Sequence, residues 1–160
     1  MNRSVIAALA ASCVLLAGCE KVAAPVAAQA AAVTEAEASK AFDDTVAVWS
    51  SMDSAKIKGL YSPDVISFDI ASPALTTDRA AFDENQDAFA AAKLDSVKVT
   101  DKKIQIVDGD TFIVSSVSDG TSSTTPANAS TFRCTDVYHR GTDGKWGIVN
   151  EHCSVPPKAA

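Results

Sequence analysis

Two cysteines near the end of the chain, Cys134 and Cys153, offer the clearest candidate chemistry. Between them lies Asp143-Gly144, a dipeptide typical of a tight turn joining two strands. If this dipeptide alone forms the turn, Thr142 pairs with Lys145 and the cysteines stand opposite each other, within disulfide range. We therefore predict a Cys134–Cys153 disulfide, although a longer turn would shift the register. The alternatives are two buried free thiols or a redox or soft-metal pair, which without a further ligand makes a poor zinc site.

Acidic residues accompany these cysteines on the same predicted strands. Asp136 lies two residues after Cys134, and Glu151 lies two residues before Cys153. Side chains two residues apart on a strand share a sheet face, so each carboxyl lies on the same face as a cysteine. A solvated carboxylate at a sheet edge is the alternative for Asp136. His152 points to the opposite side, and we interpret it as structural.

The N-terminus has the parts of a secretory signal: Arg3, an apolar run over 5–16 and small residues before Cys19. The ending Leu16-Ala17-Gly18-Cys19 resembles the lipobox of bacterial lipoproteins, in which the cysteine receives lipid and becomes the first residue. The resemblance implies a lipid-anchored protein of the cell envelope. Glu20 after the cysteine, rather than Asp, favours the outer membrane and a periplasm-facing domain. An ordinary secretory signal with an incidental cysteine is the alternative.

The charge balance argues against nucleic acid as a partner. The chain has 14 Lys and Arg against 20 Asp and Glu, and loss of Arg3 with the signal takes the net charge from −6 to −7. No basic patch is available to displace counterions from phosphates. The sequence also lacks a glycine-rich phosphate loop and a clustered His/Cys set, so we expect no cofactor and no metal. Membrane contact is expected only through the lipid.

The chain divides into a signal peptide (1–18), an Ala/Pro-rich tether (19–33), one domain (34–156) and a tail (157–160). Capping residues followed by helically spaced apolar residues predict helices from Thr34, from Asp53 and over 78–92, the last with Ala81, Phe82, Ala88 and Phe89 inward. Period-two patterns predict strands over 65–70, 97–106, 112–117, 131–140 and 145–155. The Ser/Thr-rich segment 118–130 is predicted to be a flexible loop. This order indicates an α+β fold, with three N-terminal helices covering a bent antiparallel sheet.

Two segments carry a family resemblance. Residues 53–69 read D-x₇-Y-S-P-D-V-I-S-F-D, and residues 135–156 read T-D-V-Y-H-R-G-T-D-G-K-W-G-I-V-N-E-H-C-S-V-P. With the order of elements over 34–156, they resemble the SnoaL-like branch of the nuclear transport factor two-like superfamily. The resemblance implies a cone-shaped sheet enclosing a pocket, usually in a homodimer. It leaves function open, because the superfamily includes isomerases, dehydratases and non-enzymatic hubs.

The resemblance to ketosteroid isomerase, within that superfamily, implies roles for particular residues. Asp69 follows Asp53 at the spacing of the isomerase general base, and Asp136 falls where the isomerase has its second carboxylic acid. Two carboxyls in one apolar cavity would hold one of them protonated. Thr45 stands where the isomerase has its oxyanion tyrosine, so an oxyanion hole in this chain would lack its main hydrogen-bond donor. Tyr61 aligns with a supporting tyrosine of the same pocket.

The pocket that the resemblance implies would be lined by the strand face that carries Asp136 and Cys153, with Glu151 at its mouth. The remaining pocket candidates are Trp49 on the first helix, for which ordinary core packing is the alternative, and Phe68 beside Asp69. The association domain of calcium/calmodulin-dependent kinase has pocket arginines where this chain has Asp136 and Cys153, which disfavours an anionic ligand. We therefore predict a domain that binds a small, mostly apolar, neutral or cationic molecule, or a protein partner. The alternatives are an isomerase or dehydratase with Asp69 as general base, and a purely structural dimerisation module.

Overall fold

The computed structural model describes residues 31–70, 72–123 and 129–157. The predicted signal peptide, the lipid attachment at Cys19 and the end of the tail lie outside these residues. The elements are α1 (Glu35–Ser50), α2 (Ser54–Lys58), β1 (Tyr61–Phe68), α3 (Arg79–Ala91), β2 (Ser96–Ile106), β3 (Thr111–Thr121), β4 (Ser130–Arg140) and β5 (Trp146–Ser154). No helix in the described part of the chain is long and apolar enough to cross a membrane.

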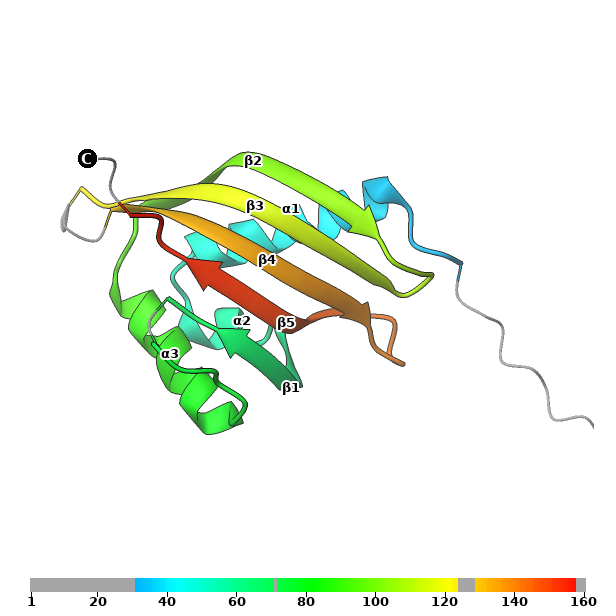
Figure 1. Cartoon of the computed structure of the whole chain (residues 1–160), viewed down its shortest axis with the longest axis horizontal. Helices are drawn as coiled ribbons and strands as arrows, with labels where there is room; N and C mark the ends of the chain where they lie inside the picture. Colours follow the sequence, from blue (N-terminus) through cyan, green and yellow to red (C-terminus); the bar gives the residue numbers. More distant parts are fainter. Residues whose placement is uncertain (1–30, 71, 124–128, 158–160) are drawn as a thin grey trace, which may run out of the picture.

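The strands form one curved sheet in the order β1-β5-β4-β3-β2, with α1 running across one face and α2 and α3 beside β1 (Figure 1). This arrangement confirms the predicted α+β fold. The β1–β5 pair, however, is parallel, whereas the prediction was a wholly antiparallel sheet. Tight hairpins enforce antiparallel pairing only between consecutive strands. Because β1 and β5 are the first and last strands, no hairpin joins them.

The three helices begin where their capping residues predict. Side chains of Thr34, Asp53 and Asp78 each accept a hydrogen bond from a backbone N–H three residues on. Helix α3 buries Phe82 and Gln86, while Ala81 and Ala88 are exposed, contrary to prediction. The buried face of α3 instead contains Phe82 and, four residues later, Gln86. This face therefore includes a polar side chain.

The hydrophobic core lies between α1 and the inner face of the sheet, and it begins one residue before the predicted domain boundary. Val33, assigned to the tether, is buried in the core cluster, and its N–H donates to the Gly109 carbonyl at 2.9 Å. The cluster also holds Ala38, Phe42, Trp49, Ile57, Tyr61, Val65, Phe82, Phe112, Val114, Tyr138 and Ile148. The domain therefore includes the last residue of the expected tether.

Strand β3 is longer than its apolar pattern indicates. It continues through Thr121, where a loop was predicted, while residues 124–128 lie outside the described part. Its inner-facing residues there are small: Ser116, Ser118 and Gly120 are all buried. A Cβ added at Gly120 would lie 2.6 Å from a ring carbon of Phe132 and 2.9 Å from Leu94 Cδ1, so a larger residue would force these side chains to move. The small residues, which predicted a loop, therefore belong to a strand, and they leave room on its inner face.

The β4–β5 hairpin reaches the predicted cysteine pairing by a different route. Its loop holds Thr142, Asp143 and Gly144, with Gly144 at φ +79°, rather than a two-residue turn. This loop shifts the register near the turn, and a bulge at Val149 shifts it back. Cys134 and Cys153 consequently stand opposite each other and form the predicted disulfide, with their Cα atoms 4.2 Å apart.

Candidate functional site

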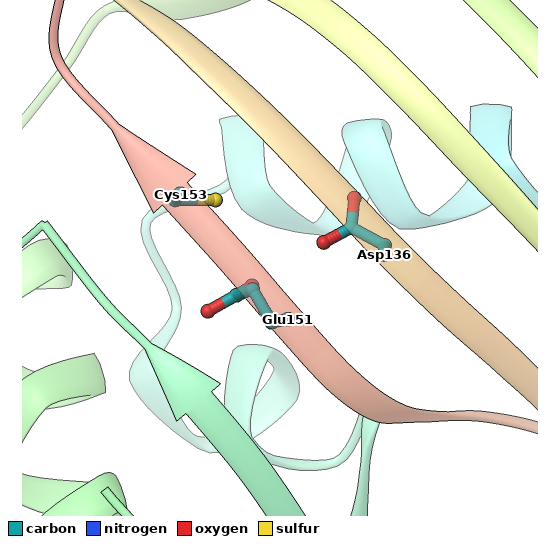
Figure 2. Close-up of side chains that lie close together, drawn as sticks. All are labelled: Asp136, Glu151 and Cys153. Carbon is teal, nitrogen blue, oxygen red and sulfur yellow. The ribbon is translucent and has the colours of Figure 1, made fainter. Parts of the chain in front are cut away.

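Four side chains of the β4–β5 hairpin form two neighbouring cross-strand pairs on the inner face of the sheet. Cys134 stands opposite Cys153, and Asp136 stands opposite Glu151. We call these four residues the hairpin square. Figure 2 shows Asp136 on β4 next to Glu151 and Cys153 on β5. One donor atom from each of these three residues lies within 4.8 Å of the other two.

Glu151 is held by a chain of hydrogen bonds that begins on α1. The Trp49 indole N–H donates to the Tyr61 hydroxyl at 3.3 Å, and this hydroxyl donates to Glu151 Oε2 at 2.6 Å. The Ser67 hydroxyl donates to Glu151 Oε1 at 3.1 Å. Burial raises the pKa of Glu151 to about 7; the hydrogen bond from Tyr61 opposes this rise, and the charge of Asp69 adds to it. Glu151 therefore titrates near neutral pH.

Asp136 has no exposed surface, and neither of its carboxyl oxygens has a hydrogen-bond partner. Burial, and then the charge of Glu151, raise the pKa of Asp136 well above its usual range. The side chain is therefore held towards its neutral, protonated form. Its like-charged neighbour adds to the cost of ionisation.

Two buried tyrosines share this environment. Burial, followed by the charges of Glu151 and Asp136, raises the pKa of Tyr61 well above its usual range. Burial and the charge of Asp136 do the same to Tyr138. Both hydroxyls therefore keep their protons at neutral pH, and Tyr61 acts as a hydrogen-bond donor.

Asp69 is buried at the end of β1 and accepts a hydrogen bond from the Gln86 amide at 2.8 Å. Gln86 comes from α3 and is itself buried. Sequence analysis missed Gln86 and Ser67, because isolated polar residues in a helix or strand usually face solvent. The one available signal was the spacing of Gln86 from Phe82, which places both on one helical face.

A cavity of about 50 Å³ lies in front of Glu151 and Asp69. On this measure one water molecule needs roughly 10–15 Å³, so the cavity holds a few small groups. Small residues on β3, Ser116 and Ser118, leave this space on the inner face. None of the described lining residues is Lys, Arg or His; they are Trp49, Tyr61, Asp69, Ile70, Gln86, Phe89, Val97, Ser116, Ser118, Phe132, Cys134, Glu151 and Cys153.

Comparison with known proteins identifies the family. The SnoaL-like domain family matches residues 42–147. The chain belongs to this family. No curated protein matches the sequence.

Solved structures share the fold of this SnoaL-like domain. A proposed calcium/calmodulin-dependent protein kinase II association domain from Xanthomonas campestris has a TM-score of 0.65 and 23% identity, over 79% of this chain and 91% of that one. A proposed ketosteroid isomerase from Parabacteroides distasonis has a TM-score of 0.62 and 18% identity, over 76% and 87%. A proposed dehydratase of the NTF2-like family from Streptomyces avermitilis has a TM-score of 0.61 and 18% identity, over 75% and 94%. These identities establish the fold alone.

Within the SnoaL-like domain, the predicted pocket residues separate into three groups. Those that line the cavity are Trp49, Tyr61, Asp69, Glu151 and Cys153. Two are buried without lining it: Asp136 lies behind Glu151, and the Thr45 hydroxyl donates to the Ala41 carbonyl at 3.0 Å. Phe68 is the third group, and its assignment to the pocket was wrong.

Phe68 lies on the outer face of the sheet. Its side chain is 48% exposed and its ring lies 5.4 Å from that of His152. Alternate residues of a strand face opposite sides, and Ser67 and Asp69 both point inward. Phe68 therefore points away from the cavity that Asp69 lines. His152 faces the same outer side, as the strand period predicted.

Among the described residues of the SnoaL-like domain, one group of acidic and sulfur side chains is close enough to hold a metal ion: Asp136, Glu151 and Cys153. The Cys153 sulfur is bonded to Cys134, so in this state the two carboxyls are the available donors. The cavity itself is lined by apolar side chains, by the carboxyls of Asp69 and Glu151, and by Trp49 and Tyr61, which form the hydrogen-bond chain to Glu151.

Proposed function

We propose that this chain is a lipid-anchored protein of the cell envelope whose SnoaL-like domain binds a small, mostly apolar, neutral or cationic molecule. The observation that carries the proposal is the cavity lining: Asp69 and Glu151 contribute carboxyls and no described lining residue is basic. An anionic ligand would place like charges together in a buried space, where repulsion is strong. A cation would be attracted by the carboxyls, and the aromatic rings of Trp49 and Tyr61 line the same cavity.

The size of the cavity limits the part of a ligand that it encloses. Pockets for drug-sized molecules measure about 300–1,000 Å³, whereas this cavity measures about 50 Å³. The enclosed part therefore suits a methyl, hydroxyl, amide or ammonium group. The rest of a larger ligand would extend past Ile70, which is partly exposed at the rim.

Three small probes of similar size and different charge test this proposal: ethylammonium, acetamide and acetate. In NMR titrations of the disulfide-bonded protein, we expect the Trp49 indole N–H signal to shift saturably with ethylammonium and acetamide. Acetate should bind more weakly by about tenfold or more, which corresponds to about 1.4 kcal/mol. Preferential binding of acetate, or no saturable shift with any probe, would contradict the proposal.

Two substitutions locate the charge preference. Glu151→Gln keeps the size of the side chain and removes its charge, so it should reduce the preference for ethylammonium over acetamide to the part that Asp69 supplies. Glu84→Gln is the matched control, because Glu84 is exposed on α3 and does not line the cavity. The control should bind all three probes as the unaltered protein does.

A second candidate function is proton transfer of the isomerase or dehydratase type. The observation that favours it is the position of Asp69, whose carboxyl faces the cavity and is oriented by Gln86. Asp69 would take a proton next to a carbonyl group of the substrate. Asp136 does not line the cavity, so it does not suit the predicted role of donor to an oxyanion.

Hydrogen–deuterium exchange into butanone, followed by NMR, tests this second candidate without knowledge of the substrate. If the domain abstracts protons, it should accelerate exchange next to the carbonyl, and Asp69→Asn should remove the acceleration while the melting temperature stays similar. Exchange that persists in Asp69→Asn rules out Asp69 as the base. Exchange at the buffer rate in the unaltered protein would argue against proton transfer and would leave the probe titrations to decide between binding and a structural role.

The anchor is supported by the lipobox-like residues 16–19 and by the apolar run before them. We expect Cys19→Ala to lose the lipid mass and to leave the membrane fraction, because stable anchoring depends on buried acyl chains. Intact-mass analysis of detergent-solubilised protein from its own host checks this, and an unchanged mature mass would contradict the anchor. Native mass of the same sample tests the homodimer that the superfamily resemblance implies.

A further inference from the structure

We propose that the hairpin square becomes a binding site for a thiophilic divalent cation, such as zinc, when the Cys134–Cys153 disulfide is reduced. The proposal concerns the reduced protein. It is therefore independent of the ligand proposed for the cavity of the disulfide-bonded form, and each can fail without the other.

The first support is the geometry of the four donors. The pairs Cys134–Cys153 and Asp136–Glu151 are adjacent and directly opposed on β4 and β5, so all four side chains leave the same face of the sheet. Donor atoms of Asp136, Glu151 and Cys153 already lie within 4.8 Å of one another. In Figure 2 the Cys153 sulfur and the Asp136 carboxyl turn towards each other. Cys134 joins this group through its bond to the Cys153 sulfur, so after reduction all four donors would surround one point on this face.

The second support is the state of Asp136. Its carboxyl is fully buried, and neither oxygen has a hydrogen-bond partner. Buried polar groups in native proteins nearly always have a partner, which is sometimes an ion. A cation between β4 and β5 would supply it. Glu151 is already fixed by hydroxyl groups of Tyr61 and Ser67, as metal-binding carboxylates commonly are.

Reduction is needed because a disulfide sulfur is a poor metal ligand, whereas a thiolate is a strong one. A dithiol would donate two electrons and two protons, break the bond between the Cys134 and Cys153 sulfurs, and itself become a disulfide. Cation binding would then displace protons from the two thiols and the carboxyls. The resulting set of two sulfurs and two oxygens matches the ligand types and number of tetrahedral zinc sites. Thiolate ligands select against magnesium and calcium.

Access to the square is available from the cavity. Glu151, Cys134 and Cys153 all line it, and both cysteines are only partly buried. An ion or a small reductant can therefore reach the sulfurs, while Asp136 closes the far side.

Cobalt and zinc titrations of the full chain test the proposal. Cys13→Ser and Cys19→Ser leave Cys134 and Cys153 as the only thiols. The chain is reduced with a dithiol and separated from it under argon. We expect the reduced chain to bind one cobalt ion with a sulfur-to-cobalt charge-transfer band, and zinc to displace it. The disulfide form should bind zinc more weakly by about 100-fold or more.

Variants separate the square from two thiols acting alone. Asp136→Asn and Glu151→Gln should each lower the zinc affinity of the reduced chain by about tenfold or more, and the double variant Cys134→Ser/Cys153→Ser should remove the charge-transfer band. Asp64→Asn, exposed on β1, is the control and should bind normally. Circular dichroism checks the fold of each variant. Equal affinity in the reduced and disulfide forms, or unchanged affinity in both folded carboxyl variants, would overturn the proposal.

Discussion

Between pH 4.5 and pH 7 the protein should lose about 3 kcal/mol of its free energy of unfolding through Glu151. Burial raises the pKa of this carboxyl from 4.5 to about 7, so in this window the folded state holds a proton that the unfolded state releases. The contribution is fully present below pH 4.5 and is lost as the pH rises through 7. Urea unfolding followed by tryptophan fluorescence, at several pH values, measures the slope.

The buried Asp136, whose pKa is also raised, adds to the decline in this window, whereas exposed aspartates act below it. Local hydrogen bonds lower the pKa of several exposed aspartates below their usual 3.8, so their contributions are lost only as the pH falls below that value. They are Asp53, Asp87, Asp95, Asp108 and Asp143. A decline in stability from pH 4.5 to pH 7 therefore has to come from buried acids.

The variant Glu151→Gln tests whether Glu151 causes the decline in the free energy of unfolding between pH 4.5 and pH 7. The amide keeps the side-chain size, and the Ser67 hydroxyl can turn to accept a hydrogen bond from it. We expect a clearly flatter pH profile in this variant and an unaltered profile in Glu84→Gln, whose side chain is exposed. An equally steep profile in Glu151→Gln would show that Glu151 is already ionised at pH 4.5 in the folded protein.

Features governed by local chemistry could be predicted from the sequence. A capping side chain acts on a backbone group three residues away, so Thr34, Asp53 and Asp78 marked the helix starts without knowledge of the fold. Strand parity likewise placed Asp136 and Glu151 on one face. The cysteine pairing was predicted from a turn that is one residue too short, and it is present only because the bulge at Val149 compensates. Nothing in the local sequence marks that bulge.

Features governed by tertiary packing could not be predicted in this way. Ser67 and Gln86 are buried because α3 and β5 meet at β1, and sequence patterns do not show which elements meet. The parallel β1–β5 pairing has the same origin. Phe68 is a different case, since strand parity alone excluded it once Asp69 was placed inside.

The stability cost of Asp136 bears on why the residue is present. Its carboxyl is buried without a hydrogen bond and next to a second buried acid. An apolar residue would suit this position better, because its cross-strand neighbour on β3 is the fully buried Val114. A polar residue that weakens the core while nearby residues satisfy the usual rules indicates a functional position.

Asp136→Val should accordingly raise the free energy of unfolding at pH 7.5 by about 1–3 kcal/mol, the usual cost of an unsatisfied buried polar group. Because the pKa of Asp136 is raised in the folded state, the difference should grow as the pH rises above 3.8 and shrink below it. Urea unfolding at pH 4 and pH 7.5, with Asp64→Asn as an exposed control, measures both values.

The two outcomes separate a structural Asp136 from a functional one. A less stable Asp136→Val would mean that the carboxyl contributes an interaction that valine cannot replace, and its retention would then need no functional explanation. A more stable variant that also loses zinc affinity in the reduced state would mean that Asp136 is kept for binding at the expense of stability. The same comparison in the disulfide form should show the stability gain without any change in probe binding to the cavity, because Asp136 does not line it.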